Sequence, residues 1–447
     1  MNFKRKLWWA QHRTDVYKYG TILSLVLIVT ISIIYFTYSK FSSTNEMTMY
    51  ETTVEPFIKN DYFIASYIDG EWSNEIPGKN DGYVVDKIVC DNGATGTWDN
   101  EEWGINIRNA TKKIKCSVYF IVKPVSVTEK IATLASTDTT NFATDDPDNN
   151  IRYIGANPNN YVYFNCSDYN NQSDSTCEKW RIIGVFKNMT KSDGTEEDLV
   201  KIIRDDSIGE YSWDSSDSST NSGTGVNDWT NVDAMKLLNS GYDSETVGGS
   251  LYWNAKSGTC YNGWANATTS CDFTSTGLKN DSTRNAIESV VWNLGGTASY
   301  TSASNGLVSH WYGYERGTTV YSGRPTTWIG KVGLMYPSDY GYATSGGLTT
   351  NRAACLAKEL YNWNGSAVSD CINNDYLFKS SYNQWTLTPR SSSGCRVFYV
   401  FTYGSAAISD TEVHVTNAIR PVVYLKSNIS ISNLGDGSKN APYQLKL

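Results

Sequence analysis

Hydrophobic and polar positions alternate most distinctly near the C-terminal end of the chain. The run 397–402, VFYVFT, is aromatic and β-branched, which predicts a strand with both faces covered. Gly404 ends this run, and a loop of small and polar residues follows it. A second apolar run, at 422–425, opens directly after Ile419-Arg420-Pro421. We therefore expect a hairpin with two packed legs and a tip that is free to vary.

The rest of the larger C-terminal region alternates between strand and helix patterns. Two runs rich in Ile and Val, 180–186 and 199–204, flank a polar insert and predict another hairpin. Helical spacing of apolar residues predicts a short helix after Asp228, a second from about 281 to 294, and a third from about 352 to 363. These patterns indicate a mixed fold in which strands and helices are interspersed.

A smaller unit precedes this region. Short strand patterns separated by Gly, Asn and Asp turns predict a small all-β, sandwich-like domain at 61–125. Its strand candidates are 62–65, 83–85, 105–107 and 116–120. We expect Trp98 and Trp103 to cover the core of this domain, with stacking on carbohydrate as the alternative. Residues 126–144, rich in Thr and Ser, are predicted to link it to the larger domain at 145–447.

The N-terminal region has the pattern of a membrane anchor. Residues 20–38 carry no charge and are just long enough to cross a bilayer. The segment 1–19 is basic, with Lys4, Arg5, Lys6, Arg13 and Lys18 opposed only by Asp15. This flank predicts a cytoplasmic N-terminus, a retained single-pass signal-anchor, a polar stalk at 39–60 and extracellular domains after it. A cleavable signal peptide is the alternative, but residues 40–43, KFSS, offer no small-x-small cleavage site.

Composition narrows the class of protein. A chain of 447 residues is too long for one ordinary domain. With 31 Tyr, 15 Trp and only 19% charged residues, it suits a β-rich extracellular protein and not a disordered one. Residues 1–40 hold six of the 38 basic and one of the 46 acidic residues, so the remainder has 32 against 45, a net charge of −13. This acidic balance argues against a nucleic-acid partner.

Nine cysteines follow the membrane segment, and eight of them form close pairs along the chain. Such pairs in an exported region predict disulfide bonds between neighbours. The predicted pairs are Cys90 with Cys116, Cys166 with Cys177, Cys260 with Cys271, and Cys355 with Cys371. Cys395 is left over. No pair has the C-x-x-C spacing of a zinc or redox site.

Metal-binding and cofactor-binding motifs are weak or missing, so we predict no cofactor and no metal site. The turn 145–150 places Asp146, Asp148 and Asn150 at alternate positions, as a calcium loop does. It lacks the glycine and the distal glutamate of an EF-hand, and a plain Asx-rich turn is the preferred interpretation.

Catalytic motifs are also missing, and we predict no catalytic residue. Outside the N-terminal region, only His310 and His414 are available as a histidine base. Neither lies in a G-x-S-x-G or H-E-x-x-H context. The Asp205-Asp206 pair would suit a glycosidase, but a solvated turn after a strand is the preferred interpretation.

Aromatic residues are concentrated in the long loops of the larger region. They cannot all be exposed without forming a large apolar patch, so most are expected in the core. A few at loop tips are candidates for stacking on sugar rings or anchoring a protein partner. The set is Tyr252, Trp253, Tyr261, Trp264, Trp311, Tyr312, Tyr314, Trp328, Tyr336, Tyr340 and Tyr342.

Four short motifs, taken in order, resemble a known domain. They are WRII at 180–183, KLLN at 236–239, WTLTP at 385–389 and IRPV at 419–422. Together they resemble an uncharacterised domain of bacterial surface proteins, similar to the formylglycine-generating, sulfatase-modifying fold and to C-type-lectin-like folds. The resemblance spans roughly residues 150–427. It implies helices packed on irregular antiparallel sheets, and a ligand face in which positions matching 390–417 vary.

Two departures from these families limit what the resemblance implies. The Glu-Pro-Asn, Gln-Pro-Asp and Trp-Asn-Asp motifs of lectin calcium sites are missing, and Asn227-Asp228-Trp229 has the wrong order. The reactive cysteine pair of the formylglycine-generating enzyme would need Cys395 and a distant partner. We therefore carry over neither calcium-dependent sugar binding nor that enzymatic activity.

The predicted fold class is α+β: a C-type-lectin-like head with irregular antiparallel sheets and two to three helices, after a small all-β domain and a transmembrane helix. The predicted function is extracellular binding or adhesion, with a protein or glycan as ligand. The alternatives are a degenerate sulfatase-modifying-like or carbohydrate-active enzyme, and a structural surface component.

The predicted ligand-binding residues flank the C-terminal strand on its turn-rich side. They are Arg390, Ser392, Phe398, Tyr403, Ser409 and His414. Trp385, Pro389, Arg420 and Pro421 are predicted to be structural, because they frame the same hairpin.

Overall fold

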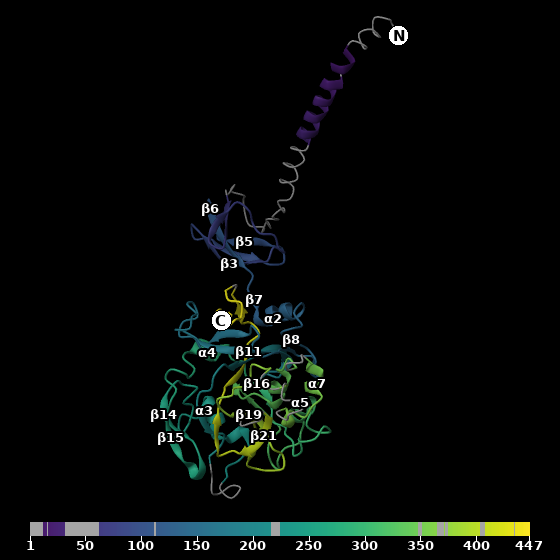
Figure 1. Ribbon diagram of the computed structural model, residues 1–447. Coiled ribbons are helices and arrows are strands. Elements are labelled where there is room, and N and C mark those ends of the chain that lie inside the picture. Colours follow the sequence, from purple (N-terminus) through teal and green to yellow (C-terminus); the bar gives the residue numbers. More distant parts are fainter. Residues whose placement is uncertain are drawn as a thin grey trace. The chain divides into compact units, whose positions relative to one another are not determined.

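The computed structural model of the chain divides into two compact units, Met1–Lys123 and Pro124–Leu447 (Figure 1). The structure describes residues 12–15, 17–31, 62–110, 113–215, 224–346, 351–363, 371, 374–402, 407–432 and 434–447.

An apolar helix, His12–Ile31, lies near the N-terminus and is long and apolar enough to cross a membrane. Its side chains at 12–15 and 17–31 are exposed, and the hydroxyls of Thr21 and Ser24 donate to the carbonyls of Tyr17 and Gly20, one turn earlier. Polar groups satisfied within the helix suit an apolar surrounding. A cleavable signal sequence has the same length and composition, so both predictions for this segment stand. The predicted residues 32–38 and the stalk at 39–60 lie outside the described residues.

The first unit contains a four-stranded sheet in the order β2-β1-β6-β3, and a separate β4–β5 ribbon. The strands are β1 (Tyr62–Ile68), β2 (Glu71–Ser73), β3 (Tyr83–Cys90), β4 (Thr95–Asp99), β5 (Gly104–Arg108) and β6 (Ile114–Val122). All four strand candidates are confirmed. Trp98 packs edge-on against Trp103 and Phe120, each with ring centroids 5.3 Å apart, so both tryptophans pack against the core as expected.

The second unit is built around two larger sheets. The seven-stranded sheet has the order β18-β23-β12-β11-β9-β8, with β10 paired to β11. The five-stranded sheet has the order β13-β22-β19-β20-β21. Their strands are β8 (Phe142–Ala143), β9 (Ile151–Tyr153), β10 (Tyr161–Phe164), β11 (Glu178–Thr190), β12 (Glu196–Arg204), β13 (Glu210–Ser212), β18 (Val332–Gly333), β19 (Gln384–Pro389), β20 (Arg396–Phe401), β21 (Ala407–Glu412), β22 (Thr416–Ala418) and β23 (Val422–Leu425). The predicted β11–β12 hairpin is confirmed.

The predicted C-terminal hairpin is wrong, because its two legs lie in different sheets. β20 pairs with β21, whereas β23 pairs with β12 and β18 of the seven-stranded sheet. Between the sheets, Arg420 donates to the carbonyls of Arg204 and Leu377 and to the side-chain oxygen of Gln384, at 3.0, 2.8 and 2.7 Å. Arg420 is therefore buried and structural, as predicted, and it marks the crossing from one sheet to the other.

Smaller ribbons complete the second unit. They are β14 (Ser257–Tyr261) with β15 (Thr268–Asp272), β16 (Val290–Asn293) with β17 (Thr327–Gly330), and β7 (Val125–Ser126) with β24 (Ser430–Ile431) and β25 (Leu445–Lys446).

The four predicted disulfides are all present, with Cα–Cα distances of 4.0, 3.9, 5.9 and 5.6 Å, and Cys395 is free. Disulfides in these positions fit an extracellular domain.

Helices are few and short, although more numerous than the two or three expected. They are α2 (Val127–Ala135), η1 (Trp229–Asn231), α3 (Asp233–Leu238), η2 (Trp264–Asn266), α4 (Asp281–Ala286), α5 (Val308–Glu315), α6 (Pro337–Tyr342), α7 (Arg352–Leu356) and η3 (Leu360–Asn362). The fold is thus mixed α and β, with many small sheets.

Two helix predictions and one linker prediction need correction. The helix expected at 281–294 ends at Ala286, and Val290–Asn293 is strand β16, because its β-branched and aromatic residues pair with β17. The helix expected at 352–363 is broken into α7 and η3. The predicted linker at 126–144 is folded: Ser126 accepts a hydrogen bond from the Glu129 amide and caps α2, whose Ile131 is fully buried.

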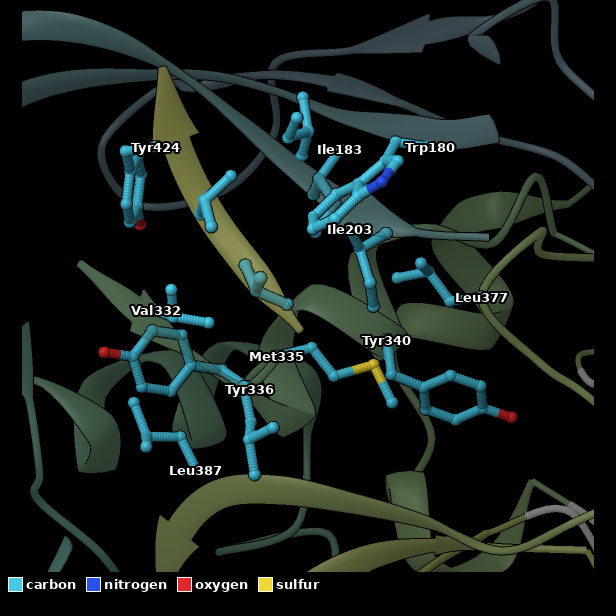
Figure 2. Packing of buried hydrophobic residues seen from close by; sticks show 14 of the residues in the cluster. Trp180, Ile183, Ile203, Val332, Met335, Tyr336, Tyr340, Leu377, Leu387 and Tyr424 are labelled. Carbon is cyan, nitrogen blue, oxygen red and sulfur yellow. The ribbon is translucent and has the colours of Figure 1, made fainter. Parts of the chain in front are cut away.

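An aromatic core fills the second unit. Figure 2 shows Met335 and Tyr336 among side chains of β11, β12 and β23, including Trp180 and Tyr424. Most of the aromatic loop residues are buried in this core, as expected.

Asp339, Arg152, Lys201 and Asp146 form a buried charged network within this core. Asp339 accepts from Arg152 Nη1 at 3.0 Å and from Lys201 Nζ, while Arg152 Nε donates to Asp146 at 2.6 Å. Asn150 donates to the same Asp146 carboxylate. Asp146 is therefore committed to a structural turn, which agrees with the plain-turn interpretation of 145–150.

We predict that Asp339→Asn lowers the free energy of unfolding by about 3–5 kcal/mol, because it leaves Arg152 and Lys201 buried without their shared counter-ion. Chemical denaturation of the full chain measures this. The matched control is Asp243→Asn, whose side chain is 54% exposed; it should stay within about 0.5 kcal/mol of the parent. Equal losses in both variants would contradict the structural role of Asp339.

A buried carboxyl predicts a pH dependence of stability. Burial raises the pKa of Asp375 to about 7, although its Oδ1 accepts from the amides of Leu377 and Phe378. The folded protein therefore keeps this proton above the pH at which the unfolded chain, with an ordinary aspartate pKa near 4, releases it. Stability contributed by the protonated carboxyl is then lost as pH rises from about 4 to about 7.

Asp375→Asn removes this titration. Between about pH 5 and pH 7, the variant should gain stability relative to the parent by up to about 1.4 kcal/mol per pH unit. Melting curves of both proteins across this range measure the difference. If the stabilities of the variant and the parent change with pH in parallel, Asp375 ionises normally in the folded chain.

Candidate functional site

The loop between β19 and β20 is held in place by one buried asparagine. Asn227 Nδ2 lies 3.2, 2.8 and 2.9 Å from the carbonyl oxygens of Arg390, Ser393 and Arg396, to which it donates. The backbone N–H of Asn227 also donates to the Gly394 carbonyl at 2.8 Å. These bonds fix the backbone from which Arg390 and Arg396 project, so their side chains start from defined positions.

Both arginines converge on Asp410 of β21. Asp410 Oδ2 accepts from Arg390 Nη1 at 2.8 Å and from Arg396 Nε at 2.5 Å, and Oδ1 accepts from the Tyr300 hydroxyl at 2.5 Å. Burial opposes ionisation of this carboxyl, but the three donors more than offset it and hold its pKa below the usual range. The side chains of Arg390 and Arg396 remain 32% and 34% exposed, so both guanidinium groups also face solvent.

Contacts continue from Arg396 along the end of β21. Arg396 Nη1 lies 4.0 Å from Glu412, whose other carboxylate oxygen lies 3.6 Å from His414 Nδ1. The His414 ring meets the Trp264 ring edge-on, with centroids 4.4 Å apart. Burial lowers the pKa of His414, so the imidazole is neutral at pH 7. We call this set, Arg390, Arg396, Asp410, Glu412, His414 and Trp264, the Asp410 row.

Trp264 ends the row on a hairpin fixed by a disulfide. It lies in η2, between β14 and β15, and Cys260 and Cys271 join those two strands. The Trp264 side chain is 55% exposed. A large aromatic ring held at the surface on a rigid hairpin is typical of a binding anchor, because little conformational entropy is lost when a ligand covers it.

Three of the six predicted ligand-binding residues reach the surface. Arg390 is partly exposed, Ser392 is exposed, and Ser409 is half-buried. Phe398 is buried against Tyr300 and Trp311, because β20 has covered faces on both sides. Its predicted outward position is wrong.

His414 is also buried and contacts the Trp264 ring edge-on, so it supports the surface and does not form it. Tyr403 lies outside the described residues. Trp385, Pro389, Arg420 and Pro421 are buried, as their predicted structural role requires.

The other candidate chemical groups have structural partners. His310 Nδ1 accepts from the Leu307 amide at 3.3 Å, at the start of α5. Asp205 pairs with Lys379 at 3.0 Å, and Asp206 accepts from the Tyr382 hydroxyl at 2.8 Å. This histidine and this carboxylate pair are thus engaged in holding the fold together. Within the described ranges, no group of three or more His, Cys, Asp or Glu residues is placed to hold a metal ion.

No protein-family model matches this chain, and neither a curated protein nor a solved structure matches it.

We predict that Asn227→Ala loosens the β19–β20 loop. The carbonyl groups of Arg390, Ser393 and Arg396 would lose the Asn227 side chain as donor, which should lower the free energy of unfolding by about 1–3 kcal/mol. Hydrogen exchange should also become faster across residues 390–396. Asn254→Ala is the matched control, since Asn254 makes one side-chain bond, to the exposed Asp243. Unchanged exchange in 390–396 would mean that Asn227 does not hold the loop.

Proposed function

We propose that this protein is a membrane-anchored, outward-facing binding protein whose lectin-like second unit recognises an extracellular protein or glycan through the Asp410 row. The observation that carries the proposal is the continuous set of contacts from the exposed Trp264 to the partly exposed Arg396 and Arg390. Tryptophan and arginine are among the residue types that dominate binding energies at recognition surfaces.

The lectin-like assignment rests on the four sequence motifs, which fall in elements of one folded unit. WRII lies in β11, KLLN ends α3, WTLTP forms most of β19, and IRPV enters β23. The strands among them carry fully buried side chains, including Trp180 and Trp385. In such a fold, the motifs would specify packing, and the loop at 390–395 would remain free to carry specificity.

The chemistry of the row favours a ligand with a ring or apolar face and an acidic group. Trp264 offers the face of an indole ring, which suits a sugar or an aromatic side chain. Arg390 and Arg396 share the buried carboxylate of Asp410, and Glu412 lies 4.0 Å from Arg396, so Arg390 is the less completely balanced of the two cations. Arginine binds carboxylate or sulfate with two parallel hydrogen bonds, which also fixes the orientation of the ligand.

The proposed topology places the second unit outside the cell. It rests on the basic flank at 1–19, on the apolar helix His12–Ile31, and on the four disulfides. An oxidising exterior and an exposed recognition surface are consistent with each other. The same features would serve an adhesion protein.

The test is binding of the full-length chain, in detergent, to arrays of acidic and neutral glycans and of extracellular proteins. For the ligands that bind, Trp264→Ala and the double variant Arg390→Gln/Arg396→Gln should each lose at least about tenfold in affinity, or about 1.4 kcal/mol. The melting temperature of Trp264→Ala should stay near that of the parent, because the ring is more than half exposed.

Lys256→Gln is the control for general charge effects, since Lys256 is a 61% exposed cation that is not one of the residues of the row. It should bind like the parent. Retained binding in both the Trp264 and the double arginine variants would place recognition elsewhere on the protein.

A further inference from the structure

A polar cavity of about 200 Å³ lies in the second unit, and none of the residues of the Asp410 row lines it. Its walls come from the end of β11, from β16, from α5 and from the turn before β9. β11 is bulged where it lines the cavity, with a register shift between Phe186 and Met189 and a left-handed backbone at Asn188 (φ 50°). Bulges of this kind often redirect side chains next to binding sites.

The floor of the cavity is held by buried hydrogen bonds. Asn150 Nδ2 donates to the Tyr312 hydroxyl at 2.9 Å, and Asn150 Oδ1 accepts from the Lys187 amide at 2.8 Å. The Tyr312 hydroxyl in turn donates to Asp148. Asn150 also bonds Asp146, which ties the floor to the buried ion pairs of Arg152. The polar groups that a ligand would meet are therefore already oriented before binding.

The charge of the cavity is dominated by Arg316. Its guanidinium carbon lies 3.3 Å from the centre of the Tyr312 ring, and its side chain is 23% exposed. Its nearest carboxylates are Asp148, 3.7 Å from Nε, and Glu315, 3.4 Å from Nη1. The Asp148 distance is too long for a hydrogen bond.

The carboxylate of Glu315 balances the positive charge of Arg316 only in part. Glu315 is fully buried and accepts from the amide and hydroxyl of Ser338. Burial raises the pKa of Glu315 to about 7, so its negative charge is incomplete at neutral pH. The exposed Lys187 adds a further cation to the rim. The cavity is thus lined by two cationic residues, Arg316 and Lys187, and by one acidic residue, Asp148.

Uncharged polar groups complete the lining. Asn188 and Asn293 face the cavity from two walls, and in the described part of the chain neither side-chain amide has a hydrogen-bond partner. An amide both donates and accepts, so it suits hydroxyl or N-acyl groups. The volume corresponds to about six or seven water molecules at about 30 Å³ each, which is the size of one small molecule and not of a peptide segment.

We propose that this cavity binds a small carboxylate-bearing molecule of monosaccharide or amino-acid size, independently of the Asp410 row. Arg316 would bind the carboxylate edge-on, through N–H groups in the plane of its guanidinium. Asn188 and Asn293 would bond the remaining polar groups, and Met189 and Val291 supply the apolar contact. A guanidinium already stacked on an aromatic ring is restrained in its orientation, which favours bidentate binding of a carboxylate.

Two matched pairs of ligands test the carboxylate requirement by isothermal titration calorimetry of the full-length chain in detergent. The first pair is methyl glucuronide and methyl glucoside; the second is N-acetylglycine and N-acetylglycinamide. At least one carboxylate should bind saturably, with its neutral counterpart at least about tenfold weaker. The pair that responds distinguishes a sugar acid from an amino-acid derivative as the source of the carboxylate. Failure of both carboxylates to bind at about 10 mM, or equal binding within both pairs, would overturn the proposal.

Two variants test the location. Arg316→Gln should lower affinity at least about tenfold, with Arg284→Gln, a partly exposed arginine on α4, as the control that binds normally. Because Arg316 contacts the buried Glu315, its loss also risks unfolding. Met189→Trp therefore fills the cavity from the half-buried rim without removing a charge, and it should abolish binding. Carboxylate binding that survives Met189→Trp unchanged would overturn the proposal, whereas loss in Trp264→Ala would place the site in the Asp410 row.

Discussion

The ion pairs of Asp339 with Arg152 and Lys201 are the constraint on which the second unit depends. They join α6 to β9 and to β12, across sequence separations of 187 and 138 residues. Aromatic rings of Phe186, Trp292, Tyr336 and Tyr424 surround Lys201, with the ammonium 4.5–5.7 Å from their centres. Burial lowers the pKa of Lys201 to about 8, yet the rings and Asp339 still favour its charged form. Such a network tolerates little displacement, because moving Asp339 away leaves the buried Lys201 without its counter-ion.

This rigidity reaches both proposed binding regions. Arg152 bonds Asp146, whose neighbour Asn150 holds the floor of the polar cavity. In the five-stranded sheet, buried Trp385 and Phe398 hold β19 and β20 in place, and Asn227 then fixes the loop between them. Each region therefore consists of a few exposed groups on a scaffold that cannot relax around them. This arrangement reduces the entropy that a ligand must overcome on binding.

Part of the candidate site was predictable, and the rest was not. Arg390 and Ser392 were found from their place in a turn-rich loop after a packed strand. The outward position predicted for Phe398 was wrong. Its own run, 397–402, already indicated a strand with two covered faces, and that pattern predicts a buried side chain. Trp264 was one of many loop aromatics, and its exposure depends on how the β14–β15 hairpin projects from the fold. No local pattern distinguishes it from Trp311, which is buried.

Features that depend on neighbours along the chain were determined by the sequence alone. The disulfide pairs, the β11–β12 hairpin, the strands of the first unit and the apolar N-terminal helix each involve residues close in sequence, where spacing and periodicity limit the choices. Only the tertiary structure decided that β20 pairs with β21, that β23 joins the other sheet, and that Arg152, Lys201 and Asp339 lie in the core. Strand pairing and the burial of charge depend on partners far away along the chain. A charged residue looks like a surface residue until its distant counter-ion and the surrounding aromatic rings are in place.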